Sequence, residues 1–341
     1  YKQATDEAVK RGNVVVLTED EADIDRFNND LAYAADAVYL ARDLATEPGN
    51  IIYPDTFVDR VREAYRGVRK TRLKVLDEKD LAELNMGALL GVGSGSDRPP
   101  RLLVIEYTGG GREAPLVLAG KGITFDTGGI SIKENDNMWH MKSDMSGAAV
   151  VSGTVLAAAR RGAPVNLVAI AALAENMPGG SAIRPGDVLT SMSGRTIEIK
   201  STDAEGRLVL SDAVWFGQVE YRPDVLIDVA TLTGSVIRAV GNTYSGLFST
   251  DEELVQQLQA AATTAGEPTW RLPLDPVHYE QISSEIADVR NGGGKAGAST
   301  GAAFIGSFIR EGQTWAHFDI AGMDYAEQAL PTVPAGYTGY G

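Results

Sequence analysis

The sequence Leu116-Val-Leu-Ala-Gly-Lys-Gly-Ile-Thr-Phe-Asp-Thr-Gly-Gly129 joins an apolar run to a glycine-rich segment that carries a lysine and an aspartate. The apolar residues 116–119 predict a buried strand. Lys121 and Asp126 should therefore lie at or just past the carboxyl end of that strand, where open α/β sheets bind their ligands. The glycines allow the backbone to turn sharply and to approach a ligand closely.

Two further glycine-containing runs carry carboxylates, Met141-Lys-Ser-Asp-Met-Ser-Gly147 and Ser201-Thr-Asp-Ala-Glu-Gly-Arg-Leu208. In an extended segment Asp203 and Glu205 would point to the same side, where they repel one another unless a cation neutralises them or a proton is shared. Arg207 has the same spacing and could act in the same cavity as an anion clamp. Oxygen-rich sites bind divalent cations without thiolate, so the three runs predict a two-metal hydrolase. Its potential metal ligands are Lys121, Asp126, Asp144, Asp203 and Glu205.

Each of these residues also has a simpler structural explanation when it is taken alone. Asp203 and Glu205 could belong to a solvated turn before a helix, and Asp126 could be a turn residue. Asp144 resembles an N-cap of a helix that begins near Gly147. A single lysine is usually a surface ammonium group. The metal-site hypothesis depends on the three runs together and on none of their residues singly.

The remainder of the chain predicts an α/β fold. Apolar runs that read as buried strands alternate with helical patterns, which is typical of a sheet covered on both faces. The predicted strands are 102–107, 116–119, 167–173 and 225–230, the predicted helices include 147–161 and 208–217, and a hairpin is predicted over 187–200. We therefore expect a mixed, largely parallel central sheet flanked by helices on both faces, with the di-metal site at the carboxyl ends of its strands.

The composition excludes several classes of function. The 341 residues carry a formal net charge of −15, which argues against nucleic acid or an anionic membrane surface as the main partner. The absence of cysteine excludes disulfides and thiolate metal sites. No apolar run approaches the roughly 20 residues of a membrane helix. We therefore expect a cytoplasmic protein with no membrane partner.

The string Thr-Asp-Ala-Glu-Gly-Arg-Leu (202–208) resembles the hallmark of the leucyl aminopeptidase family, also called cytosol aminopeptidases. The likeness extends from about Arg42 to segment 336–339. It implies that Asp126 and Glu205 bridge two metal ions. Lys121 and Asp144 would then complete the tighter site and Asp203 the more exchangeable one, with Lys121 acting as a neutral amine of lowered pKa.

The same resemblance implies the mechanism and the substrate. Lys133 would stabilise the developing oxyanion, and Arg207 would hold a bicarbonate ion that carries the proton, so no histidine is required. An apolar amino-terminal residue such as leucine or methionine would be preferred. Asp324 stands where an apolar residue is expected, so cationic or polar first residues should be accepted better than usual. The implied substrate-binding residues are Met141, Thr231, Gly234, Ala321 and Asp324.

The resemblance further implies peptide substrates, a homohexamer, and two divalent metal ions, either zinc or manganese, with magnesium or cobalt as alternatives. Residues 1–28 would be the tail of an amino-terminal domain that is missing here, 29–48 a linker helix and 49–341 the catalytic domain. Three alternatives stay open: a narrower dipeptidase, for example one acting on Cys-Gly, a DNA-binding accessory protein, and an inactive scaffold. The negative charge disfavours the second, and the intact set of ligands disfavours the third.

Overall fold

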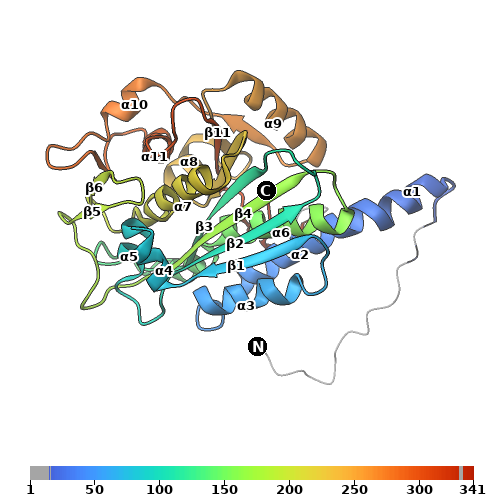
Figure 1. The fold of residues 1–341 in the computed structure, drawn as a ribbon, viewed down its shortest axis with the longest axis horizontal. Helices are drawn as coiled ribbons and strands as arrows, with labels where there is room; N and C mark the ends of the chain where they lie inside the picture. The colour runs from blue at the N-terminus through green and yellow to red at the C-terminus, as the bar shows by residue number, and fades with distance from the viewer. Residues whose placement is uncertain (1–14, 16, 330–332) are drawn as a thin grey trace.

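An eight-stranded mixed sheet forms the centre of the protein (Figure 1). The computed structural model describes residues 15, 17–329 and 333–341. In spatial order the strands are β1 (Thr71–Leu76), β2 (Arg101–Thr108), β4 (Asn166–Asn176), β3 (Leu116–Asp126), β7 (Val225–Ala230), β11 (Thr314–Asp319), β8 (Ser245–Phe248) and β9 (Thr269–Arg271).

The middle of this sheet is parallel. β4, β3, β7 and β11 are neighbours that all run in one direction, and β8 and β9 form a further parallel pair. The pairs β1–β2, β2–β4 and β8–β11 are antiparallel. The predicted mixed and largely parallel sheet is therefore confirmed. Because the central strands are parallel, their carboxyl ends lie at one edge.

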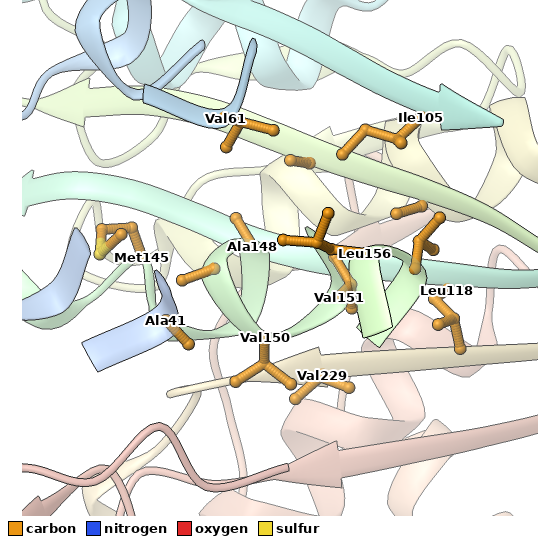
Figure 2. Close-up of a cluster of buried hydrophobic side chains, with 14 of the residues drawn as sticks. Ala41, Val61, Ile105, Leu118, Met145, Ala148, Val150, Val151, Leu156 and Val229 are labelled. Carbon is orange, nitrogen blue, oxygen red and sulfur yellow. The ribbon is translucent and has the colours of Figure 1, made fainter. Parts of the chain in front are cut away.

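Helices cover both faces of the sheet. One face packs against α2 (Ala32–Thr46), α3 (Pro54–Ala64), α6 (Ser146–Arg161) and α9 (Glu252–Ala265). The other packs against α4 (Glu78–Glu83), α5 (Gly87–Gly93), α7 (Glu205–Tyr221), α10 (Pro276–Glu280) and α11 (Gly297–Gly306). Figure 2 shows the first of these cores, in which side chains of α6 such as Val150 lie against strand residues such as Val229. Burial of such apolar surface is the main favourable contribution to folding.

Smaller elements lie around this framework. The predicted hairpin is confirmed as β5 (Val188–Thr190) and β6 (Thr196–Glu198), and β10 (Val289–Arg290) pairs with β6. The segments near the cavity described below include η2 (Met138–Ser143), a 3-10 helix, and α8 (Gly234–Val240). β12 (Tyr325–Ala326) and β13 (Gly336–Tyr337) form a short antiparallel pair.

The amino-terminal helical segment begins at Glu21, earlier than the linker helix predicted over 29–48. α1 (Glu21–Arg26), the π-helical segment η1 (Phe27–Leu31) and α2 follow one another without a break, and α1 extends away from the sheet in Figure 1. Asp20 caps the start, because its side chain accepts a hydrogen bond from the backbone N–H of Ala22 at 2.9 Å. Over the described part of the chain, none of the helices is both long and apolar enough to cross a bilayer.

Candidate metal centre

Each of the four parallel central strands has a polar residue at its end or directly after it, at the same edge of the sheet. Asp126 ends β3, Asn176 ends β4 and Asp319 ends β11, while Thr231 follows β7 directly. All four side chains are buried. A cavity of about 800 Å³ opens at this edge, and Asp126 and Thr231 line it. The predicted position at the carboxyl ends of the strands is therefore where this polar cavity opens.

A β-bulge in β3 brings Lys121 and Asp126 to the same cavity. β3 continues through Asp126, well past the predicted 116–119, so both residues belong to the strand itself. In a regular strand, positions of odd separation point to opposite faces. Opposite β4, however, the register shifts between Ile123 and Phe125, so that Thr124 is an extra residue. The bulge changes the alternation by one and turns Asp126 toward the side of Lys121.

Lys121 is buried and lies between two of the candidate carboxylate ligands, Asp144 and Glu205. Its Nζ donates hydrogen bonds to Asp144 Oδ1 at 2.8 Å, to Glu205 Oε1 at 2.9 Å and to the Thr231 carbonyl at 2.8 Å. Burial disfavours the ammonium form, but the neighbouring carboxylates outweigh that effect and raise the pKa of Lys121. With these partners alone the lysine is therefore cationic, so the neutral amine that metal ligation requires needs a competing positive charge beside it.

Lys133 pairs with the other two candidate carboxylate ligands, Asp126 and Asp203. Its Nζ donates to Asp126 Oδ2 at 2.8 Å and to Asp203 Oδ1 at 2.6 Å. Burial opposes the charge of Lys133, but the surrounding carboxylates raise its pKa. Asp126 is held in addition by the backbone N–H of Gly128, which donates to Oδ1 at 2.9 Å. Gly128 has a φ of +86°, a conformation that side-chain-bearing residues rarely adopt.

The local backbone around Asp203 and Glu205 differs from the predicted extended segment. Glu205 is the first residue of α7, which therefore starts before the predicted residue 208, and Asp203 lies in the turn that precedes it. The side chain of Glu205 is 2% exposed and that of Asp203 is 37% exposed. The two carboxylates and that of Asp126 nevertheless offer oxygens within 4.8 Å of one another. The turn into the helix, and not strand alternation, brings them together.

The structure also resolves the alternative role of Asp144 as a helix cap. The N-cap of α6 is Met145, and no side chain makes a capping hydrogen bond there. Asp144 Oδ1 instead accepts from Lys121 Nζ and, at 2.7 Å, from the hydroxyl of Thr231. Burial raises the pKa of Asp144 well above its ordinary value, although the Lys121 ammonium opposes this effect. The Asp144 side chain thus lines the cavity and does not cap α6.

Two buried oxygens show that the site suits a cation. Asp144 Oδ2 and Glu205 Oε2 have no hydrogen-bond partner among the described residues. Buried polar atoms are nearly always satisfied, and an unpaired carboxylate oxygen in a carboxylate cluster is what a divalent cation binds. Among the described residues, two ammonium groups, those of Lys121 and Lys133, form ion pairs with the four carboxylates of Asp126, Asp144, Asp203 and Glu205. The donor set therefore fits metal ions bound through oxygen and one amine.

Arg207 lies next to this cluster on the first turn of α7. Its Nη1 donates to the carbonyl of Asn291 at 2.8 Å, whereas its Nε is buried and has no partner in the described chain. Burial lowers the pKa of Arg207, and Glu205 and Asp319 oppose this effect by their charge. A guanidinium with a free N–H group beside the cavity can hold an anion.

The structure brings every predicted site residue to this cavity. Asp324 accepts a hydrogen bond from the hydroxyl of Ser143 at 2.9 Å, and burial raises its pKa to about 7. His140 also lines the cavity, whereas His278 and His317 do not. The predicted residues that line it are Lys121, Asp126, Lys133, Met141, Asp144, Asp203, Glu205, Arg207, Thr231, Gly234, Ala321 and Asp324.

The sequence reasoning missed residues that hold these groups in place. Asn176 Nδ2 donates to Asp126 Oδ1 at 2.7 Å and to the Thr202 carbonyl at 3.0 Å, so one amide joins two of the glycine-rich runs. The Thr202 hydroxyl accepts from the backbone N–H of Ser131 at 2.8 Å. A polar residue at the carboxyl end of a buried apolar strand was the available signal for Asn176 and for Asp319.

The fold and the site together define an α/β protein with a cluster of lysines and carboxylates, a candidate metal site, at the carboxyl edge of its sheet. The family model described as "Cytosol aminopeptidase family, catalytic domain" matches residues 39–341 of this chain. The chain belongs to this family. The family resemblance of the 202–208 string is therefore confirmed.

Curated relatives and solved structures agree with this assignment. The "Probable cytosol aminopeptidase 1" of Shewanella oneidensis is 52% identical over 308 residues, covering 89% of this chain and 61% of the relative. The "Cytosol aminopeptidase" of Rickettsia prowazekii is 44% identical over 333 residues, covering 96% of this chain and 66% of the relative. The chain thus spans about 61% to 66% of the length of these two proteins.

The solved structure titled "Bottromycin maturation enzyme BotP in complex with Mn" superposes with a TM-score of 0.90 at 36% identity. The superposition covers 99% of this chain and 74% of that one.

Proposed function

We propose that this chain is the catalytic domain of a metal-dependent aminopeptidase that hydrolyses the amino-terminal residue of peptides in the cytoplasm. The observation that carries the proposal is the convergence of Lys121, Asp126, Asp144, Asp203 and Glu205 on one cavity, with two buried carboxylate oxygens left unpaired. Membership in the cytosol aminopeptidase family supports it.

The metal-binding residues would divide into two sets with shared members. Asp126 and Glu205 would bind both ions, Lys121 and Asp144 would complete the tighter site, and Asp203 the more exchangeable one. Zinc or manganese would occupy them, with magnesium or cobalt as alternatives. When bound, such ions acidify a water molecule and polarise a carbonyl group. The protein's own contribution is to hold its carboxylates at fixed positions by the bonds of Asn176 and Thr231 described above.

Lys133 and Arg207 would supply the remaining charges of the reaction. The side chain of Lys133 is 24% exposed, so its ammonium can turn from Asp126 and Asp203 toward a substrate oxygen and stabilise the charge that develops there. Arg207 is fixed by the Asn291 carbonyl and would hold bicarbonate through its free N–H groups. In this scheme no histidine is needed for proton transfer.

The first side chain of the substrate would lie against Met141, Thr231, Gly234 and Ala321, with Asp324 at the base of the pocket. Methionine and small residues favour an apolar side chain such as that of leucine or methionine. Asp324 would extend the range toward cationic or polar first residues, because its buried carboxylate has no lysine or arginine partner in the described chain. A homohexamer is the assembly that we propose, to be measured by light scattering on the full chain.

The test is metal analysis together with hydrolysis of Leu-p-nitroanilide by the parent, Asp203→Asn and Lys133→Ala. We expect two ions per parent chain, loss of one ion in Asp203→Asn, and two ions without turnover in Lys133→Ala. Full activity in both variants would refute the assignment. Poor turnover of leucine substrates with rapid hydrolysis of Cys-Gly would favour the narrower dipeptidase.

A further inference from the structure

A buried carboxylate that the proposed reaction does not use lies directly behind the site. Asp319 is the last residue of β11 and is 0% exposed. Its Oδ1 accepts from the backbone N–H of Leu232 at 3.0 Å and from that of Ala321 at 3.3 Å, and its Oδ2 accepts from the Thr233 hydroxyl at 2.7 Å. A third backbone N–H, that of Thr233, lies 3.4 Å from Oδ1. The Asp319 carboxylate thus accepts hydrogen bonds from Leu232 and Thr233, which lie in the loop that follows β7.

That loop makes two contacts with the candidate ligands through a single residue. The Thr231 carbonyl accepts from Lys121 Nζ at 2.8 Å, and the Thr231 hydroxyl donates to Asp144 Oδ1 at 2.7 Å. These contacts fix the amine of Lys121 and one oxygen of Asp144 and leave Asp144 Oδ2 unpaired. Neither contact reaches Asp203. The loop's two contacts are therefore with the side chains that would complete one of the two proposed ion positions, those of Lys121 and Asp144.

The loop has few other anchors close to the site. The backbone N–H of Ile320 donates to the Ala230 carbonyl at 2.8 Å, which extends the pairing of β11 with β7 by one bond just before the loop begins. Beyond that point Thr233 caps α8, because its hydroxyl accepts from the backbone N–H of Val236 at 3.0 Å. Between these points the Asp319 carboxylate is the acceptor for the loop's amides.

We propose that Asp319 is a positioning residue that fixes the 231–234 loop and, through Thr231, orients Lys121 and Asp144 for the ion that these two residues complete. The inference rests on the proposed function. It predicts a selective effect, since a residue that merely supported the fold would alter both ion positions or neither. An outer partner of a metal ligand typically changes metal affinity by about 10- to 100-fold.

The experiment is a calorimetric titration of the metal-free full chain with Mn²⁺ alone. The parent should bind in two steps of different affinity. In Asp319→Asn the amide nitrogen replaces one of the acceptor oxygens, so the tighter step should weaken by about 10- to 100-fold while the weaker step is unchanged. Asp203→Asn should show the opposite pattern. Hydrogen exchange of the Leu232 and Thr233 amides should become faster in Asp319→Asn.

The matched control is Asp251, which caps α9 and contacts the opposite end of β11. Asp251 also accepts from a backbone N–H, that of Leu254 at 2.9 Å, and from a threonine hydroxyl, that of Thr314 at 3.3 Å. Asp251→Asn should leave both binding steps as in the parent. Should Asp319→Asn fail to fold, Thr233→Val removes the hydroxyl donor from the other side, and Thr233→Ser should restore the tighter step.

The outcomes separate the inference from the function on which it rests. Two unchanged binding steps in folded Asp319→Asn, or in Thr233→Val, would overturn the inference and leave the aminopeptidase proposal intact. Equal weakening of both steps would also overturn it, because the carboxylate would then act on the fold in general. A parent chain that binds no pair of ions would overturn the proposed function and the inference together.

Discussion

Lys121 Nζ lies 2.9 Å from Glu205 Oε1, where the buried middle of β3 meets the first turn of α7. Gly206 makes this approach possible. A Cβ atom at position 206 would lie 2.6 Å from both Cδ and Cε of Lys121. The lysine is also tied to Asp144 and to the Thr231 carbonyl, so it has little freedom to move aside.

Gly206→Ala should therefore displace the Lys121 amine and weaken metal binding without unfolding the protein. We expect the tighter Mn²⁺ affinity to fall by at least tenfold, since sites tolerate only small displacements of their ligands. Gly217→Ala, in the same helix as Gly206, is the control. It crowds Val117 of β3 and Ile170 of β4, and Gly217 does not line the cavity. It should lower the melting temperature and leave metal affinity unchanged. Equal metal affinity in both variants would contradict the role of Gly206.

Asn176→Leu should weaken metal binding by roughly 10- to 100-fold, because it removes the amide that orients Asp126 and leaves its Oδ1 with a single donor. Asn166→Leu offers a matched control at the other end of β4, where the amide bonds the backbone of residues 110, 111 and 113. The measurement is metal stoichiometry and affinity in both variants. Parent-like affinity in Asn176→Leu would show that Asp126 needs no support from β4.

The acceptance of cationic first residues should depend on pH through Asp324. Burial raises its pKa to about 7, so the carboxyl is mainly neutral below that pH and ionised above it. A hydrogen bond to a charged group contributes about 1.5–3 kcal/mol. The ratio of kcat/KM for Arg-p-nitroanilide to that for Leu-p-nitroanilide should thus rise roughly tenfold as the pH increases through 7.

Two controls separate charge from shape in that experiment. The citrulline substrate has the shape of arginine without its charge, so its ratio to leucine should stay flat with pH. Asp324→Leu should flatten the arginine profile as well. A parent-like profile in Asp324→Leu would place the titrating group elsewhere.

Stability should fall as the pH rises from about 4 to about 7 because of Asp212 on α7. Burial raises the pKa of Asp212 to about 7, although backbone N–H groups of Ala88, Leu89 and Met192 favour its ionised form. In the unfolded chain an aspartate titrates near 3.9. Between these values the folded state binds more protons than the unfolded state, so the free energy of unfolding decreases with pH, by at most about 4 kcal/mol for this group.

Asp212→Asn should remove that dependence. It should also be about 1–3 kcal/mol less stable than the parent at low pH, because the Met192 N–H loses its acceptor. Urea denaturation between pH 4.5 and 8 measures both effects, and the difference between the two slopes isolates Asp212 from other titrating groups. Identical slopes would show that Asp212 stays ionised throughout.

The central sheet and the hairpin could be predicted from the sequence because their signals are local. Apolar runs such as 167–173 and 225–230 identify strands, and their alternation with helical patterns indicates parallel pairing. Element ends were less accurate, since β3 and β4 continue into the polar residues of the site and α7 starts at Glu205. There the backbone follows contacts with neighbouring strands, which no local pattern contains.

The residues of the site could be predicted more completely than their geometry. The candidate metal ligands follow from short runs in which lysines and carboxylates stand beside glycines, whereas Lys133 and the substrate-binding residues were implied by the family resemblance. All of them line one cavity. Their proposed roles in metal and substrate binding remain predictions. The supports of the site, Asn176 and Asp319, escaped prediction because each acts on a segment far away in the chain.

The sequence by itself determined which chemical groups this protein can offer and on which kind of framework, because residue type and apolar periodicity are properties of the local chain. Only the tertiary structure decided how those groups meet. The extra residue Thr124 in β3 turns Asp126 toward the side of Lys121, and the parallel register of β7 and β11 places Asp319 behind the loop of Thr231. Such distances depend on how separate strands align and pack, and that alignment exists only once the sheet has formed.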